Sequence, residues 1–154
     1  MAWFRVDNRL LHGQIIEGWL PYLDASRLVV VNDALAADEL RQQIMMMTLS
    51  SRICGSFVSL AEAKAVFGAL EAKSVKSLFL LANCQDVLWL VEQGVTVPVL
   101  NVGNLHYAEG KRQICPHVAV SKGDEDCLRR LRQHGVVLDF RRVPGDTLTV
   151  EEWQ

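Results

Sequence analysis

Two short stretches, Leu28-Val29-Val30-Val31 and Ser77-Leu78-Phe79-Leu80-Leu81, carry no charge and almost no polar side chain. Runs of this length that are apolar at nearly every position are typical of strands buried on both faces. Such strands occur mainly in parallel sheets that lie between two layers of helices. The two stretches therefore predict an α/β fold.

The rest of the chain repeats this alternation of apolar runs and amphipathic segments. Helices are predicted over 13–23, 36–48, 60–73, 85–93 and 124–134, and strands over 3–6, 28–31, 53–59, 77–81, 97–102, 118–120 and 136–143. The expected fold is a single α/β domain, residues 1–154, with a mainly parallel seven-stranded sheet and helices on both faces. The last strand alternates polar and apolar residues, which favours an antiparallel edge strand. A polar tail is expected from about residue 144 onward.

The composition disfavours several classes of protein before any motif is considered. The 154 residues carry a formal net charge of −2, which provides no basic field for nucleic acid. Cys54, Cys84, Cys115 and Cys127 form no C-x-x-C pair, so we expect reduced thiols and no metal site. No apolar stretch reaches the roughly 20 residues of a membrane-spanning helix. We therefore expect a cytoplasmic protein, for which another subunit must provide the anchor if it works at a membrane.

One histidine lies among opposite charges near the start of the chain, in Arg5-Val6-Asp7-Asn8-Arg9-Leu10-Leu11-His12-Gly13-Gln14. The segment joins the first predicted strand to the first predicted helix. Such a junction offers unpaired backbone N–H groups and the positive end of a helix dipole, which together bind phosphate. A neutral imidazole is also a nucleophile at physiological pH. His12 is therefore the candidate phosphoryl acceptor, and a histidine that only caps the helix is the alternative.

Three charged residues of this segment could assist His12. Arg9, in the tight loop, is the first candidate to bind the phosphoryl group, because a guanidinium stabilises the charge during transfer. Arg5 is the second, since strand alternation could point its side chain toward the site. Asp7 could accept a proton from one ring nitrogen and fix the tautomer, or it could bind Arg9 and hold the loop.

Ligands of parallel sheets bind beyond the carboxyl ends of the strands. In this chain that edge would collect four polar segments: 7–12, 32–33, 83–85 and 103–111. The last of these could fold over the first and bring Lys111 or Arg112 toward an anion. A solvated connection is the alternative.

The segment Arg5–Gln14 resembles the phosphorylation-site segment of the IIB component of mannose/fructose/sorbose-type sugar phosphotransferase systems (PTS). Further segments are similar to that family in the same order, so that the resemblance covers nearly the whole chain: Glu17–Leu23, Val30–Asp33, Asp86–Gly94, Leu100–Gly103 and Gly110–Ile114. The chain departs from the family pattern at Asn104, where a second glycine is usual. It also lacks the proline often found after the position of Met47.

The resemblance implies a protein-N(pi)-phosphohistidine–sugar phosphotransferase. His12 would accept a phosphoryl group from a phosphohistidine of a IIA component and pass it to a sugar at a IIC/IID membrane permease. Arg9, Asp7 and Arg5 would assist, and no metal or organic cofactor is expected. The further residues expected to contact the phosphate or a partner are Asn8, Leu10, Leu11, Gly13, Gln14, Lys111 and Arg112.

Other hypotheses remain open at this point. A regulatory phosphocarrier of the same fold would keep His12 and signal to a partner without feeding transport. A nucleotide-binding module is disfavoured, because the chain has neither a G-x-G-x-x-G turn nor a G-x-x-x-x-G-K-[ST] loop. An exposed Trp153 or the edge strand could support a homodimer. The run Met45–Met47 is expected to fill the core on a helix.

Overall fold

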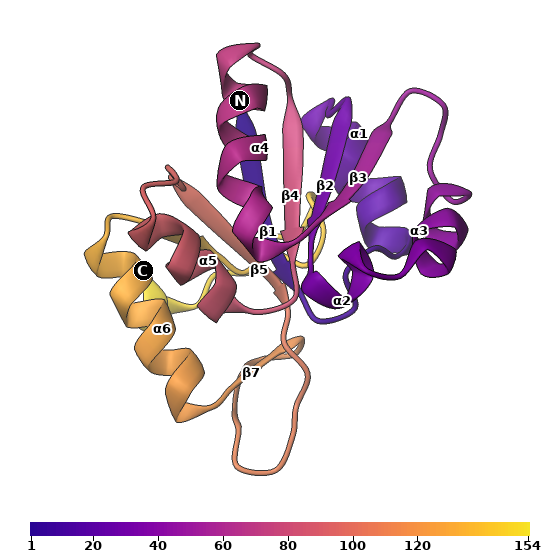
Figure 1. The fold of residues 1–154 in the computed structure, drawn as a ribbon. Helices are drawn as coiled ribbons and strands as arrows, with labels where there is room; N and C mark the ends of the chain where they lie inside the picture. Colours follow the sequence, from indigo (N-terminus) through magenta and orange to yellow (C-terminus); the bar gives the residue numbers. More distant parts are fainter.

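The computed structural model describes residues 1–154 as a single α/β domain with a six-stranded parallel sheet and a small antiparallel hairpin (Figure 1). The strand order is β3-β2-β4-β1-β5-β8. The strands are β1 Ala2–Asp7, β2 Arg27–Val31, β3 Cys54–Val58, β4 Ser77–Leu81, β5 Val99–Asn104 and β8 Val137–Asp139. The predicted α/β class and parallel sheet are confirmed. The predicted number of seven strands in that sheet is wrong.

The strand that lies outside the sheet is residues 118–120. They form β7, Val118–Val120, which pairs antiparallel with β6, Arg112–Cys115. The sequence pattern did not reveal β6, because its first two residues are polar and exposed. Figure 1 shows this hairpin extending beyond the carboxyl edge of the sheet, the edge at which β1 ends.

The last strand is an edge strand, as predicted, but it is short and parallel to β5. Before it, α6 (Lys122–Gln133) runs back along the sheet and returns the chain to the edge where the strands begin. The strand ends at Asp139, where Asn101 Nδ2 donates to the carbonyl oxygens of Asp139 and Arg141 (3.2 and 2.9 Å). The Arg141 guanidinium also turns back onto the Asp139 carboxylate. The predicted antiparallel strand over 136–143 is therefore wrong.

Two apolar clusters hold the helices to the two faces of the sheet. The larger lies beneath α4 (Leu60–Ala72), α5 (Cys84–Glu92) and α6, and three of its rings, Phe4, Phe67 and Phe79, have centroids 5.1 to 6.0 Å apart. The smaller lies on the opposite face and includes residues of η1 and α1. Polar side chains at four strand-to-helix junctions cap the helices that follow, as is typical of N-caps: Asn32, Ser59, Asn83 and Ser121.

The predicted helix over 13–23 consists of a π-helix, η1 (Gln14–Trp19), and a short α-helix, α1 (Leu20–Leu23). Pro21, in the first turn of α1, has no N–H to continue the hydrogen bonds of the π-helix, the last of which runs from the N–H of Leu20 to Ile15 O. Single π-helical turns are found frequently at functional sites. Here the π-helix begins two residues after His12.

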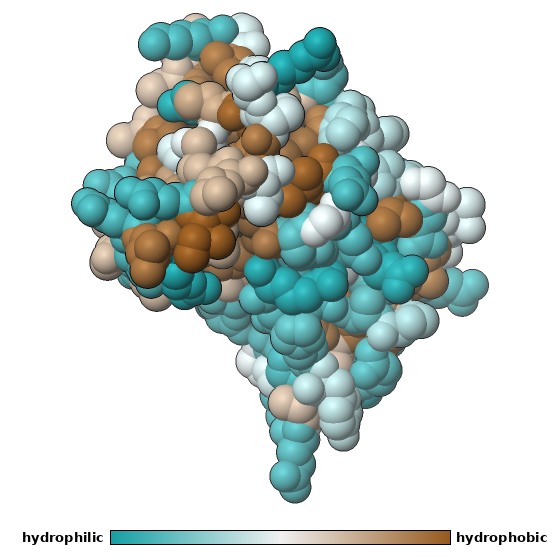
Figure 2. All heavy atoms as spheres, turned by 90° about the vertical axis from the view of Figure 1, so that its right-hand side faces the viewer, coloured by the Kyte–Doolittle hydropathy of each residue, from teal (hydrophilic) through white to brown (hydrophobic).

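The predicted helix over 36–48 is also divided, into α2 (Asp33–Ala36) and α3 (Glu39–Met46), because Asp38 caps the second helix through its side chain. None of the residues of α3 is fully buried, and Leu40 and Ile44 are exposed. Figure 2 views this side of the molecule and shows apolar atoms gathered on it. Of the three methionines, Met45 packs against the smaller cluster, whereas Met47 is 85 % exposed. The prediction that all three fill the core is therefore wrong.

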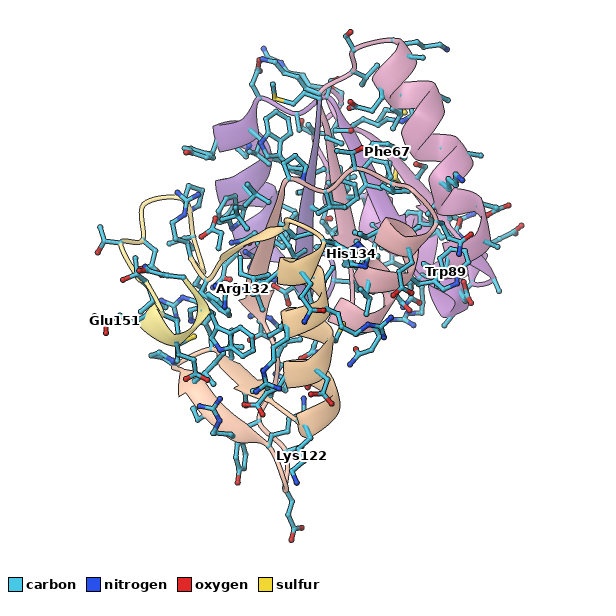
Figure 3. The ribbon with its side chains drawn as sticks, turned by 90° about the vertical axis from the view of Figure 1, so that its left-hand side faces the viewer. Phe67, Trp89, Lys122, Arg132, His134 and Glu151 are labelled. Atoms are coloured by element: carbon cyan, nitrogen blue, oxygen red, sulfur yellow. The ribbon has the colours of Figure 1, made fainter.

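The C-terminal segment folds back onto the domain. Trp153, in the 3-10 helix η2 (Glu151–Trp153), is 4 % exposed and belongs to the larger cluster. Figure 3 shows η2 with Glu151 beside α6, the helix that carries Arg132. An exposed Trp153 as the support of a homodimer is therefore wrong, and the edge strand β8 remains the predicted support.

Candidate active site

The candidate site lies at the carboxyl end of β1, in the middle of the sheet. β1 pairs with β4 on one side and β5 on the other, and its register with β5 shifts between Val6 and Asp7. In the loop that follows, Leu10 adopts the left-handed conformation with a φ of 56°. This conformation is uncommon for a residue with a large side chain, and strained positions of this kind cluster at functional sites.

Asp7 is the centre of the site and has no exposed surface. Its Oδ1 accepts hydrogen bonds from the backbone N–H and Nε of Arg9, at 3.0 and 3.3 Å. Its Oδ2 accepts from Arg5 Nη2 at 3.0 Å and lies 2.7 Å from His12 Nε2. Burial by itself raises the pKa of Asp7, but the hydrogen bonds from His12 and Arg9 and the charge of Arg5 lower that pKa to about 2. Asp7 is therefore ionised, and it meets both expectations: it binds the ring of His12 and it holds Arg9.

The two ring nitrogens of His12 have different neighbours. Nε2 faces a carboxylate, which can only accept, so this nitrogen carries the proton. Nδ1 then presents its lone pair, and the backbone N–H of Gln14 donates to it at 3.3 Å. These contacts favour the His12 tautomer that has its proton on Nε2 and a lone pair on Nδ1.

Arg9 is the exposed cation of the site. Its Nε donates to Asp7 and its Nη2 donates to Gln14 Oε1 at 3.2 Å. Its Nη1 makes no hydrogen bond within the chain, and 39 % of the side chain is exposed. Arg9 is thus anchored at one end and retains a free donor for an anion.

Arg5 occupies a different position from the one expected for a phosphate ligand. Its side chain is 1 % exposed and lies behind Asp7. Nη1 donates to Asn101 Oδ1, and the guanidinium carbon lies 5.4 Å from the centre of the Trp19 ring. A Cβ at Gly103 would overlap this guanidinium. The structure brings Arg5 to the carboxylate and not to the accessible side of the site.

Sequence reasoning missed Asn101 and Trp19 as site residues, and it placed Gly103 at this edge of the sheet, in the segment 103–111, without its contact with Arg5. Asn101 gave one usable signal, because it interrupts the apolar strand 97–102 with a polar side chain that must find partners when buried. The contacts of Gly103 and Trp19 with Arg5 depend on tertiary packing and gave no signal.

Some of the remaining residues of the loop hold it in place, and others have backbone N–H groups without a hydrogen-bond partner. Asn8 is an anchor: its Nδ2 donates to Ala82 O at 3.0 Å, and its Oδ1 accepts from the backbone N–H of His106. Leu10 is buried and Leu11 packs against the smaller cluster. The backbone N–H groups of Leu11, His12 and Gly13 make no hydrogen bond within the chain. These donors lie in the segment that carries His12 and are available to an anion.

Lys111 ends the loop after β5 and Arg112 begins β6, and both pair with acidic residues of α6, Lys111 with Asp124 at 3.7 Å and Arg112 with Glu125. Lys111 Nζ donates to His106 O at 3.1 Å, which places it beside the anchor of the His12 loop. Arg112 Nε donates to Glu125 at 3.0 Å and its Nη1 donates to Glu152 at 3.1 Å. The structure therefore brings Lys111 to the neighbourhood of the site and engages Arg112 elsewhere.

Two further properties of the chain concern its surroundings. No group of three or more histidine, cysteine or acidic side chains is placed to bind a metal ion. None of the helices is both long enough and apolar enough to span a membrane.

The fold and the site together define a parallel α/β protein whose reactive groups lie at the carboxyl edge of the sheet. Residues 1–152 match the family model of the PTS system sorbose subfamily IIB component. The chain is 38 % identical to the N-acetylgalactosamine-specific phosphotransferase enzyme IIB component 1 of Escherichia coli, over 92 % of this chain and 90 % of that protein. It is 32 % identical to the fructose-specific EIIB component of Bacillus subtilis, over 92 % and 87 % of the two chains.

Solved structures agree with these relatives. The crystal structure of the IIBSor domain of the sorbose permease from Klebsiella pneumoniae superposes with a TM-score of 0.89 at 31 % identity, covering 97 % of this chain and 93 % of that one. The N-acetylgalactosamine-specific IIB component 1 of Escherichia coli gives a TM-score of 0.89 at 36 % identity, covering 96 % and 97 %. The chain belongs to the mannose/fructose/sorbose family of PTS IIB components. It is a sugar phosphotransferase, a phosphocarrier in PTS sugar uptake.

Proposed function

We propose that His12 is the residue that carries the phosphoryl group, and that Nδ1 is the atom to which phosphorus binds. The single observation that carries this proposal is the 2.7 Å contact between His12 Nε2 and the buried carboxylate of Asp7. It keeps the proton on Nε2 and leaves the lone pair on Nδ1. The Nε2–H also stays hydrogen-bonded to Asp7 after transfer, so the ring need not turn.

The reaction consists of two transfers, and the first exchanges one P–N bond for another. The lone pair of Nδ1 attacks the phosphorus of a phosphohistidine on a IIA component, and the P–N bond of the donor breaks with its electron pair returning to the donor ring. In the second transfer the hydroxyl oxygen of a sugar attacks the same phosphorus, its proton passes to water, and the P–Nδ1 bond breaks with its electron pair returning to Nδ1. Such transfers rely on positioning and on stabilisation of the phosphoryl oxygens.

The donors for those oxygens come from the loop and from Arg9. The backbone N–H groups of Leu11, His12 and Gly13 are free, and the N–H of Gln14 points at Nδ1. The free Nη1 of Arg9 supplies a charge-assisted hydrogen bond. These groups stabilise the charge in transfer and in the phosphorylated state, because each is held before the phosphoryl group arrives.

The partners follow from the family. IIA would deliver the phosphoryl group, and a IIC/IID permease would present the sugar. We place the protein in the cytoplasm, at the inner face of the membrane through that permease. Both partners must reach His12 at the carboxyl edge, so they would use the same surface at different times and compete for it. The exposed cation there, Arg9, and the half-buried Lys111 beside it suit an acidic partner surface and contacts that dissociate fast.

The test is phosphorylation by a phosphorylated IIA component, followed by mass analysis at alkaline pH, where a phosphoramidate survives. The wild-type protein should gain one phosphoryl group and His12→Ala none. His106→Ala, His117→Ala and His134→Ala are matched controls and should each gain one. Phosphate retained on folded His12→Ala would contradict the proposal.

A further inference from the structure

Arg5 is an unusual residue to find in the interior of this domain. A guanidinium is costly to remove from water unless its charge is paired and its donors are satisfied. Here the side chain is 1 % exposed, although it lies within a parallel sheet rather than at a surface site. Its Nε has no hydrogen-bond partner in the protein. A group retained at this cost needs an explanation other than stability.

The surroundings of Arg5 fix its guanidinium on several sides. Asn101 accepts from Nη1, and the amide of Asn101 is itself held by the carbonyl oxygens of Asp139 and Arg141. Trp19 covers one side, with the guanidinium carbon of Arg141 also 5.4 Å from its ring centre. Gly103 borders another, where any side chain would overlap the guanidinium. The only charged group that Arg5 bonds is Asp7, through Nη2 and Oδ2.

That Asp7 oxygen is the one that meets His12. Oδ2 lies 3.0 Å from Arg5 Nη2 and 2.7 Å from His12 Nε2, whereas Oδ1 binds only Arg9. Arg5 therefore determines two properties of the carboxylate. It fixes which oxygen faces the ring, and it neutralises part of the negative charge that the ring experiences.

We propose that Arg5 is a positioning residue for phosphoryl transfer: wedged between Asn101, Gly103 and Trp19, it orients Asp7 and keeps His12 neutral with its proton on Nε2. This inference rests on the proposed role of His12. Arg5 itself touches neither the donor nor the phosphoryl group. Asn101 and Gly103 act one step further away, by holding the guanidinium.

The physical effect of Arg5 is on the balance between imidazole and imidazolium. A carboxylate beside a histidine favours the charged ring, which has no lone pair for attack. The cation of Arg5 on the same oxygen opposes this. The other charged or titratable groups near the cluster are Arg9 from the His12 loop, Asp139 at the end of β8, Arg141 just after it, and His117 between β6 and β7. Asp139 and Arg141 bind each other. Without Arg5, the ring would face a carboxylate balanced only by Arg9.

The first experiment examines the unmodified protein by NMR. If Arg5 is wedged as described, its guanidinium N–H protons should give separate, slowly exchanging signals, because rotation is blocked. Long-range ¹H–¹⁵N spectra should show His12 as the Nε2–H tautomer. A single averaged Arg5 signal, as for an exposed arginine, would overturn the proposal without any variant.

The second experiment uses variants with different charge and shape. In Arg5→Met the charge is lost, so the pH below which phosphoryl acceptance from IIA declines should move upward by about one unit. Arg5→Lys keeps the charge and should restore the wild-type pH dependence of phosphoryl acceptance. Transfer should remain several-fold slower, because the planar guanidinium is lost. Gly103→Ala displaces the guanidinium and should yield a mixture of His12 tautomers. Gly68→Ala, on α4 with open space around the position, is the matched control.

The outcomes separate this proposal from the proposed function. If the wild-type protein is phosphorylated at His12 but folded Arg5→Met and Gly103→Ala keep the wild-type tautomer and pH profile, Arg5 is only structural and the positioning role is wrong. If His12 is never phosphorylated, the function fails, whereas the NMR signals still report on Arg5. Should Arg5→Met not fold, Arg5→Lys, Gly103→Ala and the wild-type spectra decide the question.

Discussion

The loop after β1 and the loop after β5 meet where Asn8 binds the backbone of His106, yet they hold their charges in opposite ways. At the first, Asp7 and Arg5 in the last residues of β1 are buried and bonded to each other. In the second, Lys111 and Arg112 lie nearer the surface and pair with acidic groups of α6 and the C-terminal helix. Buried charges of this kind fix geometry, whereas surface pairs contribute little stability and exchange readily with a partner. We therefore propose that the first region carries the chemistry and that the second contributes to docking.

The largest effect is expected for Asp7→Asn. The variant leaves the Arg5 cation unpaired in the interior, which should cost about 3–5 kcal/mol of unfolding free energy. It also allows an amide N–H to face the ring, so the fixed tautomer is lost and phosphoryl acceptance should fall about 100-fold or more. Urea unfolding and single-turnover transfer from IIA measure the two quantities. Wild-type transfer by a folded Asp7→Asn protein would remove the carboxylate from the mechanism.

A smaller effect is expected for Arg9→Lys, which keeps the charge and loses the planar fork. Transfer should slow about tenfold, because one charge-assisted hydrogen bond to the phosphoryl group is weakened or lost. Binding of IIA, measured by titration calorimetry, should change much less. A rate within about twofold of the wild-type rate would make Arg9 only a loop anchor, with the backbone donors stabilising the phosphoryl group.

The pH dependence of stability offers a separate test of the buried charges. The pKa of Asp7 is lowered from its ordinary value of 3.8 to about 2, so its ionised form stabilises the fold above pH 3.8 and this contribution is lost as the pH falls through about 2. The shift corresponds to about 2 kcal/mol. The stability difference between the wild-type protein and Asp7→Asn should therefore shrink by about that amount between pH 6 and pH 2. A difference that does not depend on pH would show that Asp7 is not held as an ion.

The smallest effect is expected in the second loop. Lys111→Glu should weaken IIA binding about three- to tenfold at low salt, and much less at high salt, because rim charges act mainly on encounter. The domain should remain folded. Lys64→Glu, an exposed site on α4, is the control with the same charge change. Equal weakening by both variants would mean that net charge, and not the loop after β5, guides the partner.

The sequence predicted the parts of the fold that depend on local pattern. β2 and β4 are apolar at every position after the first, and both were placed correctly. The direction of β8 was not predictable from its own residues, because it depends on the path of α6 before it. The hairpin was missed since β6 begins with exposed polar residues.

In the candidate site, too, local sequence predicted some residues, whereas the position of others depends on tertiary contacts. The sequence alone suggested a joint role for His12, Arg9 and Asp7, because they lie close together along the chain. In the structure, Arg9 and His12 both contact Asp7. The position of Arg5 could not be predicted, because strand alternation leaves two faces and only the contacts with Asn101 and Gly103 select one. Arg112 was expected near the anion, but its pairing with Glu152 depends on the return of the C-terminal segment.

The central claim is that the buried carboxylate selects one nitrogen of His12 as the nucleophile. It is tested most directly by ¹H–¹⁵N and ³¹P NMR of the protein labelled at histidine and phosphorylated by a IIA component. The structure predicts phosphorus coupled to Nδ1 of His12, with the proton retained on Nε2 and still bound to Asp7. Phosphorus on Nε2, or on any other histidine, would contradict the account.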